Sequence, residues 1–148
     1  MRAVIQRVNS ASVSVDDSTV SQIGNGLLVY LGVVQGDSEK DADYIADKIL
    51  HLRVFQDDDG VNNLSVSDIK GEILIISQFT ICADARHGRR PSYSNAERPE
   101  VAKTLYSYLC DLCSKTITTK TGIFQAHMHI DSVNDGPITI LLDSRRTF

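Results

Sequence analysis

A short apolar segment near the middle of the chain carries three polar side chains that could take part in chemistry. Within Ile75–Ile81, the side chains of Ser77, Gln78 and Thr80 interrupt an otherwise apolar run. Polar groups on a buried strand are costly unless they are hydrogen-bonded, so their presence needs a reason. One explanation is an edge strand with one face in water. The other is the floor of a pocket, where hydroxyls, an amide and main-chain N–H groups face a ligand.

A cation-rich segment follows and is a second candidate. Between Arg86 and Arg98 the chain carries four arginines, one histidine and Tyr93. A solvated loop explains such a run. In a protein of net charge −4, however, this local concentration of positive charge could also hold phosphate groups.

Cysteine and histidine spacings give weaker candidates. Cys110 and Cys113 have C-x-x-C spacing, but they lie in a predicted amphipathic helix and no second pair completes a zinc site. His127 and His129 lack a partnering cysteine or carboxylate pattern, so packing or surface roles are favoured. The usual nucleophile, zinc-protease, phosphate-loop and dinucleotide motifs are absent. We therefore expect neither a metal nor a cofactor.

These residues need a scaffold, and most of the chain has the pattern of β-strands. The apolar run after the Gly24–Gly26 turn is typical of a buried central strand. A tight turn over Asn134–Pro137 is expected to join the last two strands. The predicted strands are 3–8, 11–15, 27–33, 53–55, 72–81, 123–133 and 138–142.

Two segments have the apolar spacing of amphipathic helices. The first begins after Ser38, a good N-cap with Asp41 as an imperfect capping box, and ends near residues 51–52. The second begins at Pro99, which fits the first helical position, and continues to Leu112. Because strands and helices do not alternate regularly, we predict an α+β fold with a barrel-like, mostly antiparallel sheet and two packed helices.

Composition sets the broad class of the protein. Hydrophobic residues at 42% and charged residues at 23% are ordinary for a globular protein, and 148 residues fit a single domain over 1–148. No apolar run approaches the roughly 20 residues that span a bilayer, so we expect no membrane association. The N-terminal segment lacks the continuous apolar core expected of a signal peptide, and three cysteines suit a reducing compartment. We therefore expect a cytoplasmic protein.

Three separated motifs resemble the D-aminoacyl-tRNA deacylases, first named for D-tyrosyl-tRNA. They are SQFT at 77–80, HGRRPSYS at 87–94 and NDGPIT at 134–139, and MRAVIQRV, GNGLLVYLGV and TGIF extend the match over effectively the whole chain. The resemblance implies a homodimer with its active site at the subunit interface. It implies hydrolysis of the ester between a D-amino acid and the 3′-terminal adenosine of tRNA, and removal of mischarged glycine.

The resemblance also implies roles for individual residues. Gly136 and Pro137 would form the family's Gly-cisPro motif, inserted from one subunit into the other subunit's pocket. Its carbonyl oxygens would accept the substrate's ammonium hydrogens, so that an L side chain meets the Pro137 backbone while a D side chain passes. Arg7 would brace this turn through hydrogen bonds to carbonyls. Phe124 and Met128 would seat the terminal adenine by stacking and apolar contact.

The chemistry must proceed without an evident catalytic triad. No histidine accompanies Ser77 or Thr80 in a recognisable motif, and an unassisted hydroxyl is a weak nucleophile. Thr80 has been regarded in the family as a possible nucleophile. The favoured route instead stabilises the oxyanion with main-chain N–H groups near Phe79 and Thr80, while the ribose 2′-hydroxyl helps to activate water. Gln78 would orient the ribose or the water.

Two other functions stay open at this point. A tRNA-binding module without catalysis would depend on the Arg86–Arg98 loop and not on SQFT. A metal-dependent hydrolase would use His127, His129 or the cysteines. His127 also departs from the family pattern, which has an acidic or small residue before Met128, and this leaves the detail of the adenine pocket open.

Overall fold

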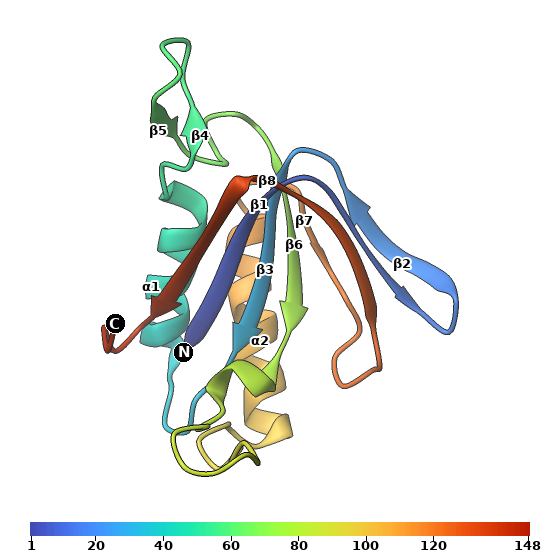
Figure 1. The fold of residues 1–148 in the computed structure, drawn as a ribbon, viewed down its shortest axis with the longest axis vertical. Helices are drawn as coiled ribbons and strands as arrows, with labels where there is room; N and C mark the ends of the chain where they lie inside the picture. Colours follow the sequence, from blue (N-terminus) through green and yellow to red (C-terminus); the bar gives the residue numbers. More distant parts are fainter.

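The computed structural model describes residues 1–148, and its main sheet is organised around the first strand (Figure 1). This strand, β1 (Arg2–Val15), pairs antiparallel with β3 (Gly26–Gly32) along its first half and with β2 (Ser18–Ile23) along its second half. β8 (His129–Asp143) pairs antiparallel with both halves of β1. Because one long strand has three partners, the sheet bends around it.

The sheet continues in parallel on its other side. β6 (Glu72–Ser77) pairs with β3, and β7 (Thr119–Thr121) pairs with β6, both in parallel. The hydroxyl of Ser21 on β2 donates to the carbonyl of Thr121 on β7 at 2.7 Å, which brings the two edges of the sheet together. The predicted barrel-like sheet is therefore confirmed, with its antiparallel pairs centred on β1. A separate hairpin is formed by β4 (Phe55–Gln56) and β5 (Asn62–Leu64).

Both predicted helices form, and both lie on the same face of the sheet, behind it in Figure 1. They are α1 (Glu39–His51) and α2 (Pro99–Ser114). The carboxylate of Asp41 accepts the N–H of Ser38 at 2.9 Å, as expected of a capping box. The helices and this face of the sheet share a core of 22 buried residues, against 7 in a second cluster. Neither helix has the length and apolarity needed to cross a membrane.

The predicted strand over 72–81 is too long. β6 ends at Ser77, and Phe79–Cys82 forms a 3₁₀ helix, η1. The reason lies on the neighbouring strand, because Gly32 ends β3 where η1 crosses it. A Cβ at Gly32 would lie 2.9 Å from the carbonyl oxygen of Gln78 and 2.7 Å from the sulfur of Cys82. The absence of a side chain there allows η1 to fold closely over β3.

The predicted pair of strands at 123–133 and 138–142, joined by a turn, is wrong. β8 is one strand, and it pairs with β1 on both sides of the expected turn, with Val8 opposite Asn134 and Gln6 opposite Thr139. On β1 only Arg7 lies between these two pairs, whereas on β8 the four residues 135–138 do. Residues 135–138 therefore leave the ladder and form an excursion within the strand. The side-chain amide of Asn134 donates to the carbonyl oxygens of Arg7 at 2.9 Å and Ile138 at 3.0 Å, which closes the base of this excursion.

Candidate active site

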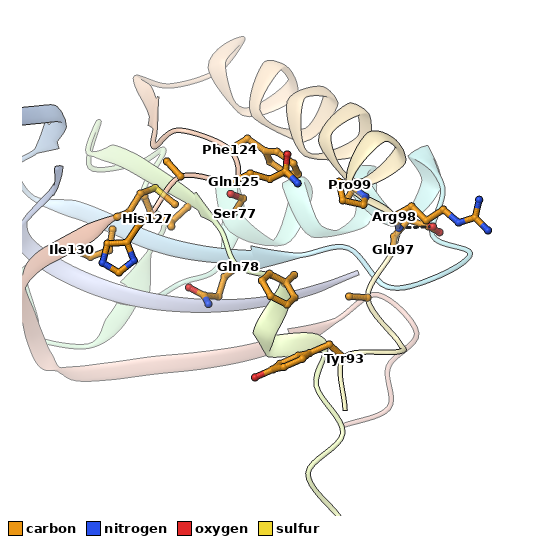
Figure 2. A pocket seen from close by; sticks show the side chains of 16 residues that line it. Ser77, Gln78, Tyr93, Glu97, Arg98, Pro99, Phe124, Gln125, His127 and Ile130 are labelled. Carbon is orange, nitrogen blue, oxygen red and sulfur yellow. Dashed lines mark hydrogen bonds between the residues drawn. The ribbon is translucent and has the colours of Figure 1, made fainter. Parts of the chain in front are cut away.

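A cavity of about 770 Å³ opens where β6 ends, between η1, the start of α2 and the segment that leads into β8. In Figure 2 Ser77 and Gln78 lie between His127 at one end of the cavity and Pro99 with Arg98 at the other. The cavity is lined by Ile76, Ser77, Gln78, Phe79, Tyr93, Ala96, Glu97, Arg98, Pro99, Ala102, Phe124, Gln125, Ala126, His127, Met128 and Ile130.

The floor of the cavity is held by the main chain. The N–H of Gln78 donates to the carbonyl of Leu31 at 2.8 Å, which ties the end of β6 to β3. The first hydrogen bond of η1 runs from the N–H of Ile81 to the carbonyl of Gln78 at 3.4 Å. The N–H groups of Phe79 and Thr80 come before it and have no carbonyl within the helix to accept them. Two adjacent main-chain donors at the start of η1 are thus not used by the helix itself.

The wall beyond the floor is aromatic and apolar. The Phe124 ring packs against Tyr106 with 5.8 Å between centroids, and the Tyr106 hydroxyl donates to the carbonyl of Ile75 at 2.8 Å. Burial raises the pKa of Tyr106, so this hydroxyl stays protonated and keeps its role as a donor. Met128 approaches Gly122 so closely that a Cβ there would lie 2.5 Å from its sulfur. Gly122 therefore makes room for the Met128 side chain.

The rim next to α2 contains one carboxylate with a structural role. Glu97 accepts the N–H of Arg98 at 2.8 Å and the N–H of Gly36 at 3.0 Å. These hydrogen bonds lower the pKa of Glu97, so the group is ionised at neutral pH and holds the loop to the end of β3. The Arg98 guanidinium points away from the cavity in Figure 2.

The structure brings together five of the nine predicted site residues: Ser77, Gln78, Phe79, Phe124 and Met128 all line this cavity. Thr80 lies next to the cavity but does not line it, and its hydroxyl accepts a hydrogen bond from the Gln78 amide. No histidine is hydrogen-bonded to Ser77 or Thr80.

Arg7, Gly136 and Pro137 lie elsewhere, at the opposite end of the sheet from η1. In Figure 1 β8 bends at the upper end of the main sheet, whereas β6 runs downward into η1. The Gly136–Pro137 peptide bond is cis, as the resemblance implies, and both residues are exposed. Gly136 has φ of +117°, a value that side chains rarely tolerate. None of the three lines the cavity of its own chain.

Arg7 supports the excursion, but through partners other than the expected ones. Its Nη1 donates to the carbonyl of Val54 at 2.6 Å, outside the turn. Its Nε lies 2.8 Å from the carboxylate of Asp135, an ion-pair distance. The N–H does not point along this line, so Nε is buried without a hydrogen bond and the contact is a charge pair. Arg7 therefore contacts the turn through the charge of Asp135. The main-chain carbonyl to which it donates a hydrogen bond belongs to Val54 and not to the turn.

The alternative metal ligands do not assemble into a site. No group of three or more histidine, cysteine, aspartate or glutamate side chains is close enough to hold a metal ion. The rings of His127 and His129 meet edge to face with centroids 5.1 Å apart. Cys110 and Cys113 are buried in α2, as predicted, and burial raises the pKa of each thiol to about 12.

Several lining residues were missed in the sequence, among them Ala102, Gln125 and Ile130. Ala102 and Ile130 cannot be recognised from the sequence, because their side chains are apolar and carry no reactive group. Whether they face the cavity depends on how α2 and β8 pack. Arg98 and Tyr93 belong to the segment that the sequence marks as cation-rich. Their place at the cavity follows from contacts with the segment directly after β3, which is remote in sequence: Ala96 bridges to Val34, and the N–H of Glu97 donates to the carbonyl of Val33.

The fold and the site together define a class of protein, one with a small barrel-like sheet and a pocket equipped with main-chain donors but no nucleophile–base pair. The chain belongs to the D-Tyr-tRNA(Tyr) deacylase family, whose model matches residues 4–143. It is 53% identical to the D-aminoacyl-tRNA deacylase of Clostridioides difficile (strain 630) and 54% identical to that of Desulforamulus reducens, in each case over 149 residues and 100% of both chains.

Solved structures share the fold of this chain. The structure named as the c-Myc DNA Unwinding Element Binding Protein is 39% identical and superposes with a TM-score of 0.92 over 97% of this chain and 98% of the other. A probable eukaryotic D-amino acid tRNA deacylase has a TM-score of 0.82 over 95% and 97% of the two chains. At 16% identity the second structure shows the fold alone. The predicted family and fold are thus confirmed.

Proposed function

We propose that the protein hydrolyses the ester bond of D-aminoacyl-tRNA, and of mischarged glycyl-tRNA, to release the free amino acid and tRNA. Full-length similarity to the D-aminoacyl-tRNA deacylases supports the substrate class. The observation that carries the proposal is the floor of the cavity, where Ser77, Gln78 and Phe79 meet and where the N–H groups of Phe79 and Thr80 precede the first hydrogen bond of η1. Such paired donors are suited to the oxyanion that forms when an ester carbonyl is attacked.

The reaction requires water rather than a protein nucleophile. Water attacks the ester carbonyl carbon, the carbonyl oxygen becomes negatively charged, and the two N–H groups stabilise it. The bond from this carbon to the ribose 3′-oxygen then breaks, and that oxygen takes up the proton that the water loses. The neighbouring 2′-hydroxyl of the substrate assists this transfer, and Gln78 orients the ribose or the water. The engagement of the Thr80 hydroxyl with Gln78 supports this route over attack by Thr80.

The terminal adenosine would occupy the apolar side of the cavity. Phe124 offers a ring to the base, and Met128 offers an adaptable thioether surface. The side chain of Phe124 is backed by Tyr106, whose hydroxyl is tied to β6. An adenine held in this way would place its ribose near Ser77 and Gln78.

The handedness filter would come from a second copy of the chain. Gly136 and Pro137 are exposed at the end of the sheet opposite η1, so they do not contribute to the cavity of their own chain. In a homodimer, each subunit would insert this turn into the partner's cavity. Its carbonyl oxygens would hold the substrate ammonium group, and the backbone at Pro137 would exclude an L side chain by contact. Glycine, which has no side chain, would pass.

Matched substrates test the activity directly. The purified protein should release D-tyrosine from D-tyrosyl-tRNA and glycine from glycyl-tRNA, and should leave L-tyrosyl-tRNA intact. Equal hydrolysis of the D and L esters would contradict the handedness filter. Binding of tRNA with no hydrolysis of any ester would favour a non-catalytic binding module, and loss of activity in EDTA would favour a metal-dependent hydrolase.

Subunit complementation tests the shared site. Two variants, Phe124→Ala/Met128→Ala in the cavity and Gly136→Ala/Pro137→Ala in the turn, should each be inactive alone. In a mixed dimer one of the two cavities is intact and receives an intact turn. Because about half of the dimers are mixed after equal mixing, about a quarter of wild-type activity should return. Mixed dimers that form but stay inactive would show that the turn serves the cavity of its own chain or none.

A further inference from the structure

The outer rim of the cavity carries aromatic side chains that the proposed reaction does not use. The Phe79 side chain is 57% exposed and that of Tyr93 is 43% exposed. Their rings meet edge to face with 5.2 Å between centroids, and both line the mouth of the cavity. Two exposed aromatic rings in contact with each other form a surface on which a flat, partly polar ligand can stack.

Tyr93 is held in place although it is exposed. On one side of it, Asp84 and Ser92 exchange two backbone hydrogen bonds, each of 2.8 Å. On the other side, Ala96 bridges to Val34, and the N–H of Gln35 donates to the carbonyl of Asn95 at 2.9 Å. The segment that carries Tyr93 is therefore tied at both ends, and little conformational entropy is lost when a ligand contacts the ring.

The cations of the same loop are not equivalent. Arg86 is neutralised by Asp84, with 2.6 Å from Nη2 to Oδ2 and 2.9 Å from Nε to Oδ1. Arg89, Arg90 and Arg98 are exposed, and none of their guanidinium groups has a carboxylate oxygen within 4.0 Å. Three unpaired guanidinium groups thus lie in the same cation-rich segment as Tyr93, in a protein that is acidic overall.

We propose that this rim, made of Phe79, Tyr93, Arg89, Arg90 and Arg98, binds the unpaired nucleotides that precede the terminal adenosine of the substrate RNA. This inference rests on the proposed function, because it assumes that the terminal adenosine occupies the cavity. The strand that leads to that adenosine must then leave over the rim. One base stacks on the Phe79–Tyr93 pair, and the guanidinium groups contact the phosphates on either side.

The chemistry of the rim matches single-stranded RNA. Proteins hold unpaired nucleotides by stacking bases on aromatic rings and by placing arginines along the phosphates. Stacking needs no particular base, so such a rim would accept any tRNA. Duplex RNA presents no free base face, and it would not use Tyr93.

The first test compares two substrates that differ only in the nucleotides outside the cavity. These are D-tyrosyl-tRNA and the D-tyrosyl ester of adenosine alone. For Tyr93→Ala and for Arg89→Gln/Arg90→Gln, the ratio of kcat/KM for the tRNA to kcat/KM for the adenosine ester should fall about tenfold. Tyr93→Phe, which keeps the ring, should restore the ratio. Lys115→Gln, which removes a cation from the far end of α2, is the matched control and should leave the ratio at the wild-type value.

The second test does not depend on catalysis. Fluorescence anisotropy measures binding of a labelled single-stranded RNA that ends in CCA and carries no amino acid. Wild-type protein should bind it, and Tyr93→Ala should weaken binding. Arg89→Gln/Arg90→Gln should reduce the salt slope of log K by roughly 1.4, the value for two phosphate contacts on a single strand. Light scattering on each variant reports the oligomeric state.

The outcomes separate this inference from the proposed function. If wild-type protein hydrolyses no D ester but binds the RNA through Tyr93 and the arginines, the proposed function fails and the RNA surface stands. If hydrolysis proceeds but neither the substrate ratio nor the binding responds to these variants, the RNA surface is wrong. A change of oligomeric state in Tyr93→Ala with RNA binding retained would also overturn it, because the rim would then be a contact between copies of the chain.

Discussion

The side-chain amide of Gln78 donates a hydrogen bond to the hydroxyl of Thr80, the residue directly after Phe79 in the first turn of η1. Thr80 does not line the cavity, whereas Gln78 does. The hydroxyl therefore fixes the orientation of the Gln78 amide. In the proposed reaction this arrangement makes Thr80 a positioning residue for Gln78, and the main-chain N–H of Thr80 would be its direct contribution.

Thr80→Ala should lower kcat only several-fold, because the substrate's own 2′-hydroxyl and the main-chain donors remain. Thr80→Ser, which keeps the hydroxyl, should retain most of the wild-type rate. Single-turnover hydrolysis of D-tyrosyl-tRNA measures both. Activity of a folded Thr80→Ala protein below the detection limit would instead identify Thr80 as the nucleophile.

Gly32→Ala should displace η1 and reduce both stability and activity. The new Cβ would lie 2.7 Å from the Cys82 sulfur and 2.9 Å from the Gln78 carbonyl oxygen, and the backbone cannot yield without moving the floor of the cavity. Gly24→Ala is the matched control, since its nearest neighbour would be 3.7 Å away. The Tm of thermal unfolding and kcat/KM should both fall for Gly32→Ala and stay near the wild-type values for Gly24→Ala. An active, stable Gly32→Ala protein would disprove the packing argument.

The Arg7–Asp135 pair should show measurable energetic coupling. The Arg7 side chain is 9% exposed and that of Asp135 is 40% exposed, so the pair is intermediate between a buried and a surface ion pair. A double-mutant cycle of Arg7→Met and Asp135→Asn, followed by urea unfolding, should give a coupling free energy of about 1–2 kcal/mol. Both single variants should also hydrolyse L-tyrosyl-tRNA faster relative to the D ester. Coupling near zero would show that the carboxylate does not hold the turn.

Glu72 should stabilise the fold in a pH-dependent way. Its carboxylate accepts the N–H of Gly24 at 2.7 Å and pairs with Lys120 at 3.3 Å, and the Gly24 hydrogen bond is the main cause of its lowered pKa. A carboxylate whose pKa is lowered in the folded state stabilises that state above its unfolded pKa, and the contribution disappears as pH falls through the folded pKa. Glu72→Gln should therefore lower Tm at pH 7 and have little effect at pH 3.

A matched variant separates this effect from general loss of charge. Asp131→Asn removes an exposed carboxylate that forms no ion pair, and its Tm should follow wild type at both pH values. A Tm deficit for Glu72→Gln that is equal at pH 7 and pH 3 would assign the loss to packing.

The sequence predicted the helices well because their signals are local. Ser38 and Asp41 mark the start of α1 with their own side chains, and Pro99 begins α2 by its fixed φ. Of the motif SQFT, the residues Ser77, Gln78 and Phe79 line the cavity, and Thr80 lies next to it. The end of β6 at Ser77 was not predicted, because Gly32 on another strand decides where η1 can fold.

In the C-terminal part of the chain, contacts that are remote in sequence override the local signals even more strongly. Asn134–Pro137 has the residues of a tight turn, but pairing with β1 on both sides keeps the chain in one direction. The polar strand β2 was missed, since its exposed residues lack an apolar alternation. Tyr93 and Arg98 could be marked as cation-loop residues, but their position at the cavity depends on Val34, about sixty residues away in the chain.

The excursion in β8 has a practical consequence for redesign. Its base is closed by Asn134 and by ladder pairs that continue on either side, while Asp135 pairs with Arg7 and Ile138 packs against the core. A different dipeptide in place of Gly136 and Pro137, with Asp135 and Ile138 kept, should leave the scaffold intact while it alters what reaches a neighbouring molecule. If the turn acts as the proposed handedness filter, stereochemical preference could then be evolved in the laboratory at these positions, with the rest of the chain held constant.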